Sequence, residues 1–211
     1  NAARNYNRLT WSEDGLALAV LKGVDVDKMR ERDNILIAFS PVQAALDAEP
    51  APVVLDPAKA DGFPKGWVVS DRASLSWSDD RKRVFFGMKE QVAAPDTTRR
   101  RGTDELADVD VWNTGDERIQ SMQMVRAEQD RNFTFRQVFD VSAAKFVKLA
   151  DATMRDLDVA PDGRWAVGRD TRGYISDYKR AAADIYRVNT TTGERTLMLK
   201  NQMINTSTGN H

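Results

Sequence analysis

The sequence contains no cysteine, which excludes disulfides, thiolate metal ligands and cysteine nucleophiles. It has a single histidine, His211, which is the last residue. A serine-peptidase triad needs an imidazole held by packing and by a partner side chain, and a terminal residue is a poor candidate for that role. Metal sites built on several histidines are excluded on the same count.

A surplus of charge of either sign is also missing. The 31 basic residues nearly balance the 32 acidic ones, for a net charge of −1. This balance argues against a dedicated nucleic-acid-binding protein, which normally carries a basic surplus. No apolar run approaches the ~18 residues of a membrane-spanning helix, so we expect no membrane span.

What the sequence does contain is a repeated turn pattern, followed each time by an apolar run. The copies lie at residues 9–15, 75–81 and 157–163. Their spacing exceeds the ~40–50 residues of a standard four-stranded propeller blade, so loops or extra strands must be inserted. Asp-Gly pairs in the outer copies predict type I′ hairpin turns, in which both central residues have a positive φ. The middle copy has Arg81 in place of glycine, so a different turn is expected there.

The strands beside these turns are apolar on both faces. In the runs 16–21 and 35–39, for example, apolar side chains point to either side. An antiparallel sheet with one wet face would alternate apolar and polar residues instead. We therefore expect sheets covered on both faces, with Leu18, Ile37 and Phe86 away from solvent.

These patterns predict an all-β fold built from stacked four-stranded antiparallel sheets, the blades of a partial β-propeller. Residues 1–211 are expected to form one propeller segment, with repeat units at about 9–61, 66–150 and 151–200 and a flexible polar tail at 204–211. Polar segments between the hairpins occupy corresponding places in the repeats, so we expect them at one end of the blades. They are residues 23–33, 90–106 and 170–183.

Several charged motifs have both a functional and a structural interpretation. The acidic pairs Glu13-Asp14, Asp79-Asp80 and Asp116-Glu117 would suit the two carboxylates of a glycosidase, but they lie at predicted turns that aspartate stabilises. Asp25-Val26-Asp27 lacks the glycine and later glutamate of an EF-hand loop. Arg99-Arg100-Arg101 is followed by acidic residues that offset its charge. We therefore predict turns and solvated loops here, and no catalytic, cofactor-binding or metal-binding residue.

The tryptophans lie in or beside the predicted strands. A ligand-binding platform is one interpretation. Packing in the core or between blades is favoured, because aromatic residues prefer strands and bury large areas. The residues are Trp11, Trp67, Trp77, Trp112 and Trp165.

Specific segments also follow one another in a distinctive order along the chain. They are Phe63-Pro64-Lys65, residues 75–80, 84–87, 108–112, 123–132, 145–151, 184–186 and 192–195. This order, which extends over most of residues 9–200, resembles the N-terminal β-propeller of bacterial serine peptidases of the prolyl oligopeptidase family. In that family the catalytic serine, aspartate and histidine belong to a separate α/β-hydrolase domain, which the propeller covers. Nothing in this sequence matches the hydrolase half, so the resemblance transfers no catalytic residue.

The resemblance implies a non-catalytic propeller that restricts which peptides reach a hydrolase domain outside this chain. The expected partners are that hydrolase domain or a peptide substrate, together with self-association through open blade edges, and no cofactor or nucleic acid. The resemblance also implies a periplasmic or secreted protein. Two alternatives stay open: a protein-interaction propeller of the WD-repeat or TolB-like type, and a propeller glycosidase.

Overall fold

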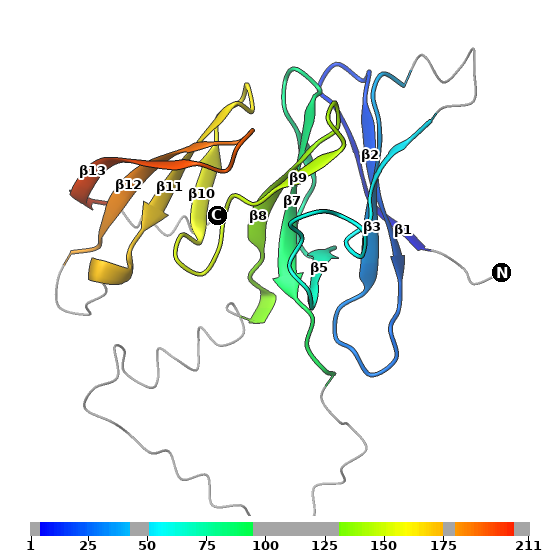
Figure 1. Cartoon of the computed structure of the whole chain (residues 1–211), viewed down its shortest axis with the longest axis horizontal. Helices are drawn as coiled ribbons and strands as arrows, with labels where there is room; N and C mark the ends of the chain where they lie inside the picture. The colour runs from blue at the N-terminus through cyan, green and yellow to red at the C-terminus, as the bar shows by residue number, and fades with distance from the viewer. Residues whose placement is uncertain (1–4, 43–50, 95–130, 175–179, 205–211) are drawn as a thin grey trace, which may run out of the picture.

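The structure is a computed structural model and describes residues 5–42, 51–94, 131–174 and 180–204. The predicted strand of residues 108–112 and most of the tail lie outside these ranges. The described residues form antiparallel β-sheets that follow one another in chain order along the long axis of the molecule (Figure 1). None of the described residues forms a helix long and apolar enough to cross a membrane.

The first sheet and the third sheet each have four strands in sequential order. The first sheet consists of β1 (Asn5–Trp11), β2 (Leu18–Val24), β3 (Asp33–Phe39) and β4 (Val53–Leu55). The third consists of β10 (Asp156–Val159), β11 (Trp165–Asp170), β12 (Ala182–Asn189) and β13 (Arg195–Met203). A short 3-10 helix, η2 (Arg172–Tyr174), follows β11.

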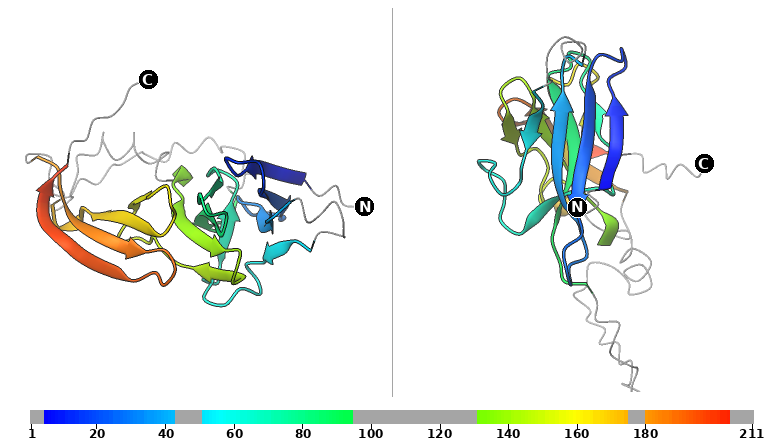
Figure 2. Two further views of the ribbon diagram at one scale, coloured as in Figure 1. Left: turned by 90° about the horizontal axis from the view of Figure 1, so that it is seen from above. Right: turned by 90° about the vertical axis from the view of Figure 1, so that its right-hand side faces the viewer.

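The middle sheet has the order β5-β7-β8-β9, and β6 pairs with β7 beside this path. Its strands are β5 (Trp67–Ser70), β6 (Ser76–Trp77), β7 (Arg83–Glu90), β8 (Phe135–Asp140) and β9 (Lys145–Val147). Viewed from above, the three sheets lie in a curved row with the middle one between its neighbours (Figure 2).

The middle sheet is buried on both faces, as the apolar pattern predicts. In β7, Val84, Phe86 and Met88 join a core cluster shared with the first sheet, whereas Phe85 joins a second cluster shared with the third sheet. Every residue of this strand except Glu90 is buried. Burial of one large apolar side chain contributes about 1.5–3 kcal/mol, so these two interfaces hold the stack together. The fold is therefore all-β, with sheets stacked as in propeller blades.

The first sheet is dry on one face only. Ala19, Leu21, Leu36 and Ala38 pack against the middle sheet. The opposite face carries the half-buried Leu18 and Ile37, and Tyr6, Trp11 and Val54 are 60%, 49% and 43% exposed. The expectation of two covered faces is therefore wrong for this sheet, because no described residues pack against its outer face.

The three repeated turns adopt one conformation. In each, the amide of the fourth residue donates to the carbonyl of the first: Gly15 to Ser12, Arg81 to Ser78 and Gly163 to Ala160, at 2.8–2.9 Å. Only the fourth residue has a positive φ, of 70°, 56° and 69° respectively. These are type I turns followed by a left-handed residue, so the prediction of type I′ turns is wrong.

The expectation of a different turn at Arg81 is also wrong. A left-handed φ costs a non-glycine residue roughly 1–2 kcal/mol. At this turn the Arg81 guanidinium lies 3.2 Å from the carboxylate of Asp14 in the adjacent sheet, and its carbonyl accepts from the Ser40 hydroxyl at 3.2 Å. The ion pair with Asp14 depends on the arginine side chain and would be absent with glycine, whereas the backbone contact with Ser40 would not.

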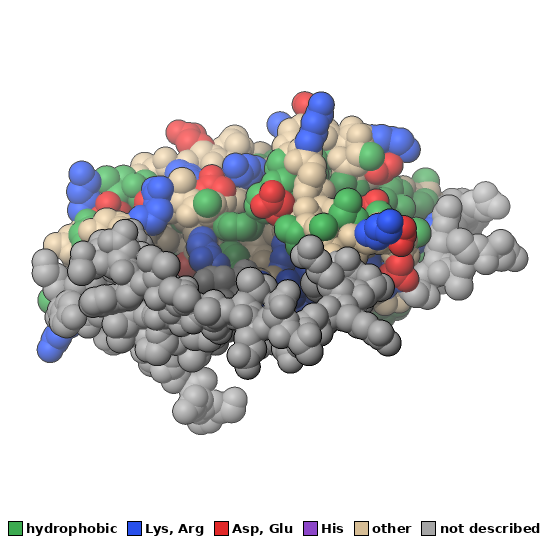
Figure 3. Space-filling view, turned by 90° about the horizontal axis from the view of Figure 1, so that it is seen from below, with side chains coloured by type: hydrophobic (Ala, Val, Ile, Leu, Met, Phe, Trp, Pro, Cys, Tyr) green, Lys and Arg blue, Asp and Glu red, His purple; other side chains and the backbone are tan. Residues whose placement is uncertain are grey.

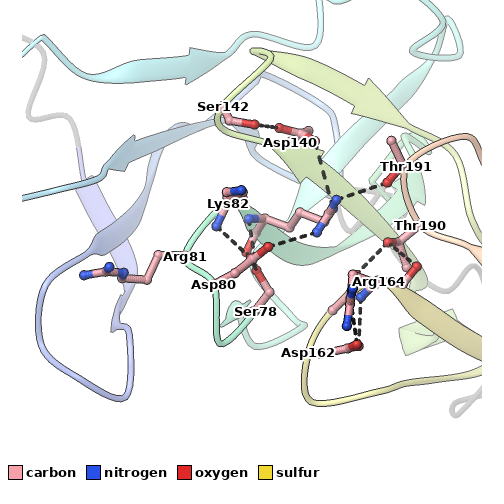
Figure 4. Close-up of polar contacts among 12 residues, drawn as sticks. Ser78, Asp80, Arg81, Lys82, Asp140, Ser142, Asp162, Arg164, Thr190 and Thr191 are labelled. Atoms are coloured by element: carbon pink, nitrogen blue, oxygen red, sulfur yellow. Dashed lines mark hydrogen bonds and ion pairs between the residues drawn. The ribbon is translucent and has the colours of Figure 1, made fainter.

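A buried arginine, Arg83, connects the middle and third sheets at the same end of the stack. Its partners Asp80, Asp140 and Thr191 come together there (Figure 4). The guanidinium of Arg83 lies 3.4 Å from Asp80 and 3.9 Å from Asp140, and it donates to the Thr191 hydroxyl at 3.0 Å. Arg83 is only 8% exposed. Because Thr191 belongs to the turn between β12 and β13, this side chain ties the two sheets together.

Candidate functional site

Loops from two sheets meet at the other end of the stack. The amide of Arg30, in the loop between β2 and β3, donates to the carbonyl of Val92 at 2.9 Å. The amide of Ala94 donates to the carbonyl of Lys28, also at 2.9 Å. Described parts of the polar segments 23–33 and 90–106 therefore lie side by side, as predicted for loops at one end of the blades.

A pocket of about 250 Å³ opens beside these loops. Four cationic side chains line it, from the loop after β2, the end of β7, the approach to β8 and the approach to β10: Arg30, Lys89, Arg131 and Arg155. Among the described residues of the lining, Glu90 is the one carboxylate. Lys and Arg side chains are visible in the hollow on this underside of the molecule (Figure 3). We call this site the cationic pocket.

Aromatic rings form the other wall of the cationic pocket. Trp67 and Phe135 have ring centroids 5.5 Å apart, and Phe133 meets Phe135 edge-on at 5.0 Å. The guanidinium of Arg155 lies 4.1 Å from the centre of the Phe133 ring, a cation–π contact. The pocket thus combines positive charge with an apolar surface that is held in a fixed geometry.

A buried carboxylate lies behind the cationic wall. Glu31 is 4% exposed, and its two carboxylate oxygens share the Nε–H of Arg72, at 3.0 and 3.1 Å. Gln91 holds its backbone, because the Gln91 side chain accepts from the Glu31 amide at 3.0 Å and donates to its carbonyl at 2.7 Å. The other end of Arg72 donates to Asn132 at 2.9 Å. Glu31 therefore links loops of both sheets beneath the pocket.

Lys89 shares this carboxylate at a longer distance. Its ammonium lies 3.7 Å from Glu31 and makes no hydrogen bond within the described ranges, although the residue is only 9% exposed. Burial lowers the pKa of Lys89 and the negative charge of Glu31 opposes that effect. Glu31 is therefore shared by two cations of the described residues, Lys89 and Arg72.

The acidic pairs within the described residues stabilise turns, as predicted. Asp14 accepts from the Ser12 hydroxyl at 2.7 Å and from the Leu16 amide at 3.0 Å. Asp80 makes the corresponding contacts with Ser78 at 2.6 Å and Lys82 at 3.1 Å. These hydrogen bonds lower the pKa of Asp14, and at Asp80 they outweigh the opposing effect of burial, so the carboxylates are held ionised within the turns.

The remaining charged motifs contribute no site in the described part of the chain. Asp25 pairs with Arg32 at 2.8 Å, and no three His, Asp or Glu side chains of the described ranges gather as metal ligands would. Asp116-Glu117 and Arg99-Arg100-Arg101 lie outside the described residues.

The tryptophans divide into packed and exposed residues. Trp77 and Trp67 pack against the cluster between the first two sheets, and the Trp77 indole donates to the carbonyl of Thr10 in the first sheet at 3.2 Å. Trp11 and Trp165 are 49% and 39% exposed, so the prediction of packing is wrong for them. Trp112 lies outside the described ranges.

Sequence reasoning did not identify the residues of the cationic pocket. Glu31 lies in a polar run that is typical of a solvated loop, and Lys89 ends a strand at a position where an exposed lysine is common. One available signal is the alternation of β7, in which Lys89 shares a face with Phe85 and Gly87. That position predicts a buried lysine, which requires either a partner or a ligand.

Neither a protein-family model nor a curated protein matches this chain. Among solved structures, the β-propeller domain of the trilobed protease from Pyrococcus furiosus aligns with 91% of this chain and 42% of its own, at 11% identity and a TM-score of 0.39. An acylaminoacyl peptidase from Pyrococcus horikoshii aligns with 94% of this chain and 25% of its own, at 10% identity and a TM-score of 0.40. A prolyl endopeptidase aligns with 94% of this chain and 22% of its own, at 14% identity and a TM-score of 0.38. The chain spans less than half the length of each of these proteins.

Proposed function

We propose that this chain is the non-catalytic propeller portion of a serine peptidase of the prolyl oligopeptidase type. In this proposal it restricts the access of peptides to a hydrolase domain that lies outside these residues. The observation that carries the proposal is the stack itself: three sheets with two dry interfaces, whose loops meet at one end beside the cationic pocket. A rigid stack with loops at one end can select ligands by size without taking part in bond cleavage.

The residues of the described ranges support the non-catalytic part of this proposal. The carboxylates of Asp14 and Asp80 are engaged in turns, and Glu31 is held by Arg72. The one histidine of the chain is its last residue. Hydrolysis of a peptide bond by a serine needs a base beside the nucleophile, and the proposal assigns both groups to the hydrolase domain.

A fluorophosphonate probe, which modifies activated serines, tests this assignment. We expect the polypeptide, as it occurs in its cell, to be labelled at one serine outside residues 1–211 and to cleave short fluorogenic peptides but not folded proteins. A labelled serine within these residues, or the absence of labelling in a protein that is otherwise folded, would refute the proposal.

A protein-interaction propeller is the second candidate, and the apolar outer face of the first sheet favours it. Tyr6, Trp11 and Val54 are exposed there in one patch with the half-buried Leu18 and Ile37. Exposed apolar surface of this kind, beside an open strand edge, promotes association of chains. Light scattering tests this candidate: a dimer that Trp11→Ser and Val54→Ser convert to a monomer supports it, and a monomer at high concentration contradicts it.

A further inference from the structure

The outer face of the first sheet corresponds to faces that are covered inside the stack. When the repeated turns are aligned, Trp11 and Leu18 correspond to Trp77 and Val84 of the middle sheet. Trp77 and Val84 pack in the cluster against the preceding sheet. Ala166, the equivalent of Val84 in the third sheet, packs in the cluster against the middle sheet in the same way. The outer face of the first sheet thus has the positions that receive a preceding sheet.

The outer face of the third sheet has the opposite positions of the repeat. Val167 corresponds to Phe85 of the middle sheet and to Ala19 of the first sheet. Phe85 and Ala19 each pack against the sheet that follows them in the row. Val167 and Trp165 share the outer face of β11, where they are 43% and 39% exposed. This face thus has the positions that contact a following sheet.

A hydrogen bond inside the stack indicates what Trp11 would gain from a preceding sheet. The Trp77 indole donates to the carbonyl of Thr10 in the sheet before it, at 3.2 Å. The residue of the third sheet that corresponds to Thr10 is Asp158. Docked on a third sheet, the exposed Trp11 would donate to the Asp158 carbonyl and bury its ring in the interface.

Each end of the row therefore presents the face that the other end requires. We propose that the outer face of the first sheet docks on the outer face of the third sheet of a second copy of this chain. The contact would continue the two interfaces already present within the stack. One kind of chain is sufficient, because every copy carries both faces. The self-association itself rests on the second candidate function above, whereas the choice of the two faces rests on the repeat.

The curvature of the row favours a closed assembly. The three sheets of one copy follow a curve rather than a straight line (Figure 2). Two copies joined twice through the same pair of faces would form a ring of six sheets, within the roughly four to eight blades of closed propellers. A head-to-tail contact of this kind gives a closed ring when its rotation returns to the start. Both apolar outer faces would then be covered.

The turns of the stack provide positions at which the contact can be trapped. The amide of Asp79 donates to the carbonyl of Pro161 at 3.3 Å, which holds the turns of the middle and third sheets side by side. Glu13 is the position of the first turn that corresponds to both. The proposed contact therefore places Glu13 of one copy beside Pro161 of the other, and both residues are exposed.

Cross-linking of two marked chains tests this placement, since the sequence has no cysteine of its own. Full polypeptides with Glu13→Cys and with Pro161→Cys are co-expressed, purified under reducing conditions and then oxidised. We expect a disulfide-linked dimer that is several-fold more abundant than with either variant alone, because a disulfide forms only between closely placed residues. Asp61→Cys, at an exposed position of the loop between β4 and β5, is the matched control and should give no such dimer with either variant.

Light scattering of surface variants tests the two faces separately. We expect Val167→Ser in the third sheet to convert the dimer to a monomer as Trp11→Ser in the first sheet does. A thermal melt identifies any variant that fails to fold. A dimer that Trp11→Ser abolishes and Val167→Ser leaves intact would contradict the proposal.

The other outcomes separate the proposed contact from self-association as such. Cross-linking of Glu13→Cys with itself as readily as with Pro161→Cys would show that two first sheets meet; the second candidate function would then stand and the head-to-tail contact would fail. A mixture no more cross-linked than the Asp61→Cys control would also overturn the contact. A full polypeptide that stays a monomer at high concentration would exclude both.

Discussion

Two glycines in equivalent turns provide a test of how the middle and third sheets are stacked. Gly15 and Gly163 have almost the same φ, 70° and 69°, and each ends a turn of the repeated type. A Cβ on Gly15 would meet no atom within 4 Å, whereas a Cβ on Gly163 would lie 2.3 Å from the Cβ of Ser78 in the adjacent sheet. Substitution by alanine therefore changes the backbone energy equally at both positions and adds a clash at only one.

The two costs can be estimated separately. Alanine in the left-handed region costs about 1–2 kcal/mol, and the lower entropy of its unfolded chain offsets part of that. Overpacking of a tight interface adds about 1–3 kcal/mol. We therefore expect Gly15→Ala to lower the free energy of unfolding by about 1 kcal/mol and Gly163→Ala to lower it by about 2–4 kcal/mol.

Urea unfolding followed by circular dichroism measures this difference, and a double-mutant cycle identifies its cause. Ser78→Gly destabilises by itself, because the Ser78 hydroxyl caps its own turn. In the Gly163→Ala background it also removes the clashing atom, so the two substitutions together should cost at least about 1 kcal/mol less than their sum. Equal effects of the two alanine substitutions, or strict additivity in the cycle, would refute the stacking at these turns.

Two further predictions concern the polar contacts between sheets. Arg83→Met should lower the free energy of unfolding by about 3 kcal/mol, because it leaves the buried Asp140 without its cation. Thr191→Val, which removes one hydrogen bond to Arg83, should lower it by only about 1 kcal/mol. Thermal unfolding compares the two variants, and equal costs would contradict the charge argument. Partial burial would raise the pKa of Asp151, but hydrogen bonds from Thr153 and Arg195 hold it well below its usual value near 3.8. The stabilisation from ionised Asp151 is present above that value and is lost as the pH falls through the lowered pKa. Asp151→Asn should therefore destabilise at pH 7 but progressively less below about pH 4, and a deficit independent of pH would exclude this linkage.

Much of the fold could be predicted from the period of the apolar residues. The alternation of Val84, Phe86 and Met88 with Phe85 is local information, and it correctly indicated that β7 is covered on both faces. The same pattern in the first sheet led to a wrong expectation for Leu18 and Ile37. Periodicity shows that a face is apolar, but only the other segments decide whether anything covers it.

The turn at Arg81 and the cationic pocket could not be predicted for a common reason. Arg81 is compensated by Asp14, which is distant in the sequence and adjacent only when the sheets stack. Glu31 and Lys89 likewise come from different sheets. Propensity rules describe what a residue prefers among its neighbours along the chain, and long-range partners override them.

The middle sheet is buried on both faces because it lies between two others. Amide hydrogen exchange compares its strand β7 with β2, since each pairs with strands on both sides but only β7 is covered on both faces. We predict that the amides of residues 84–88 exchange only through global unfolding and those of residues 19–23 exchange faster. Exchange in β7 that is as fast as in β2 would contradict the stacked arrangement.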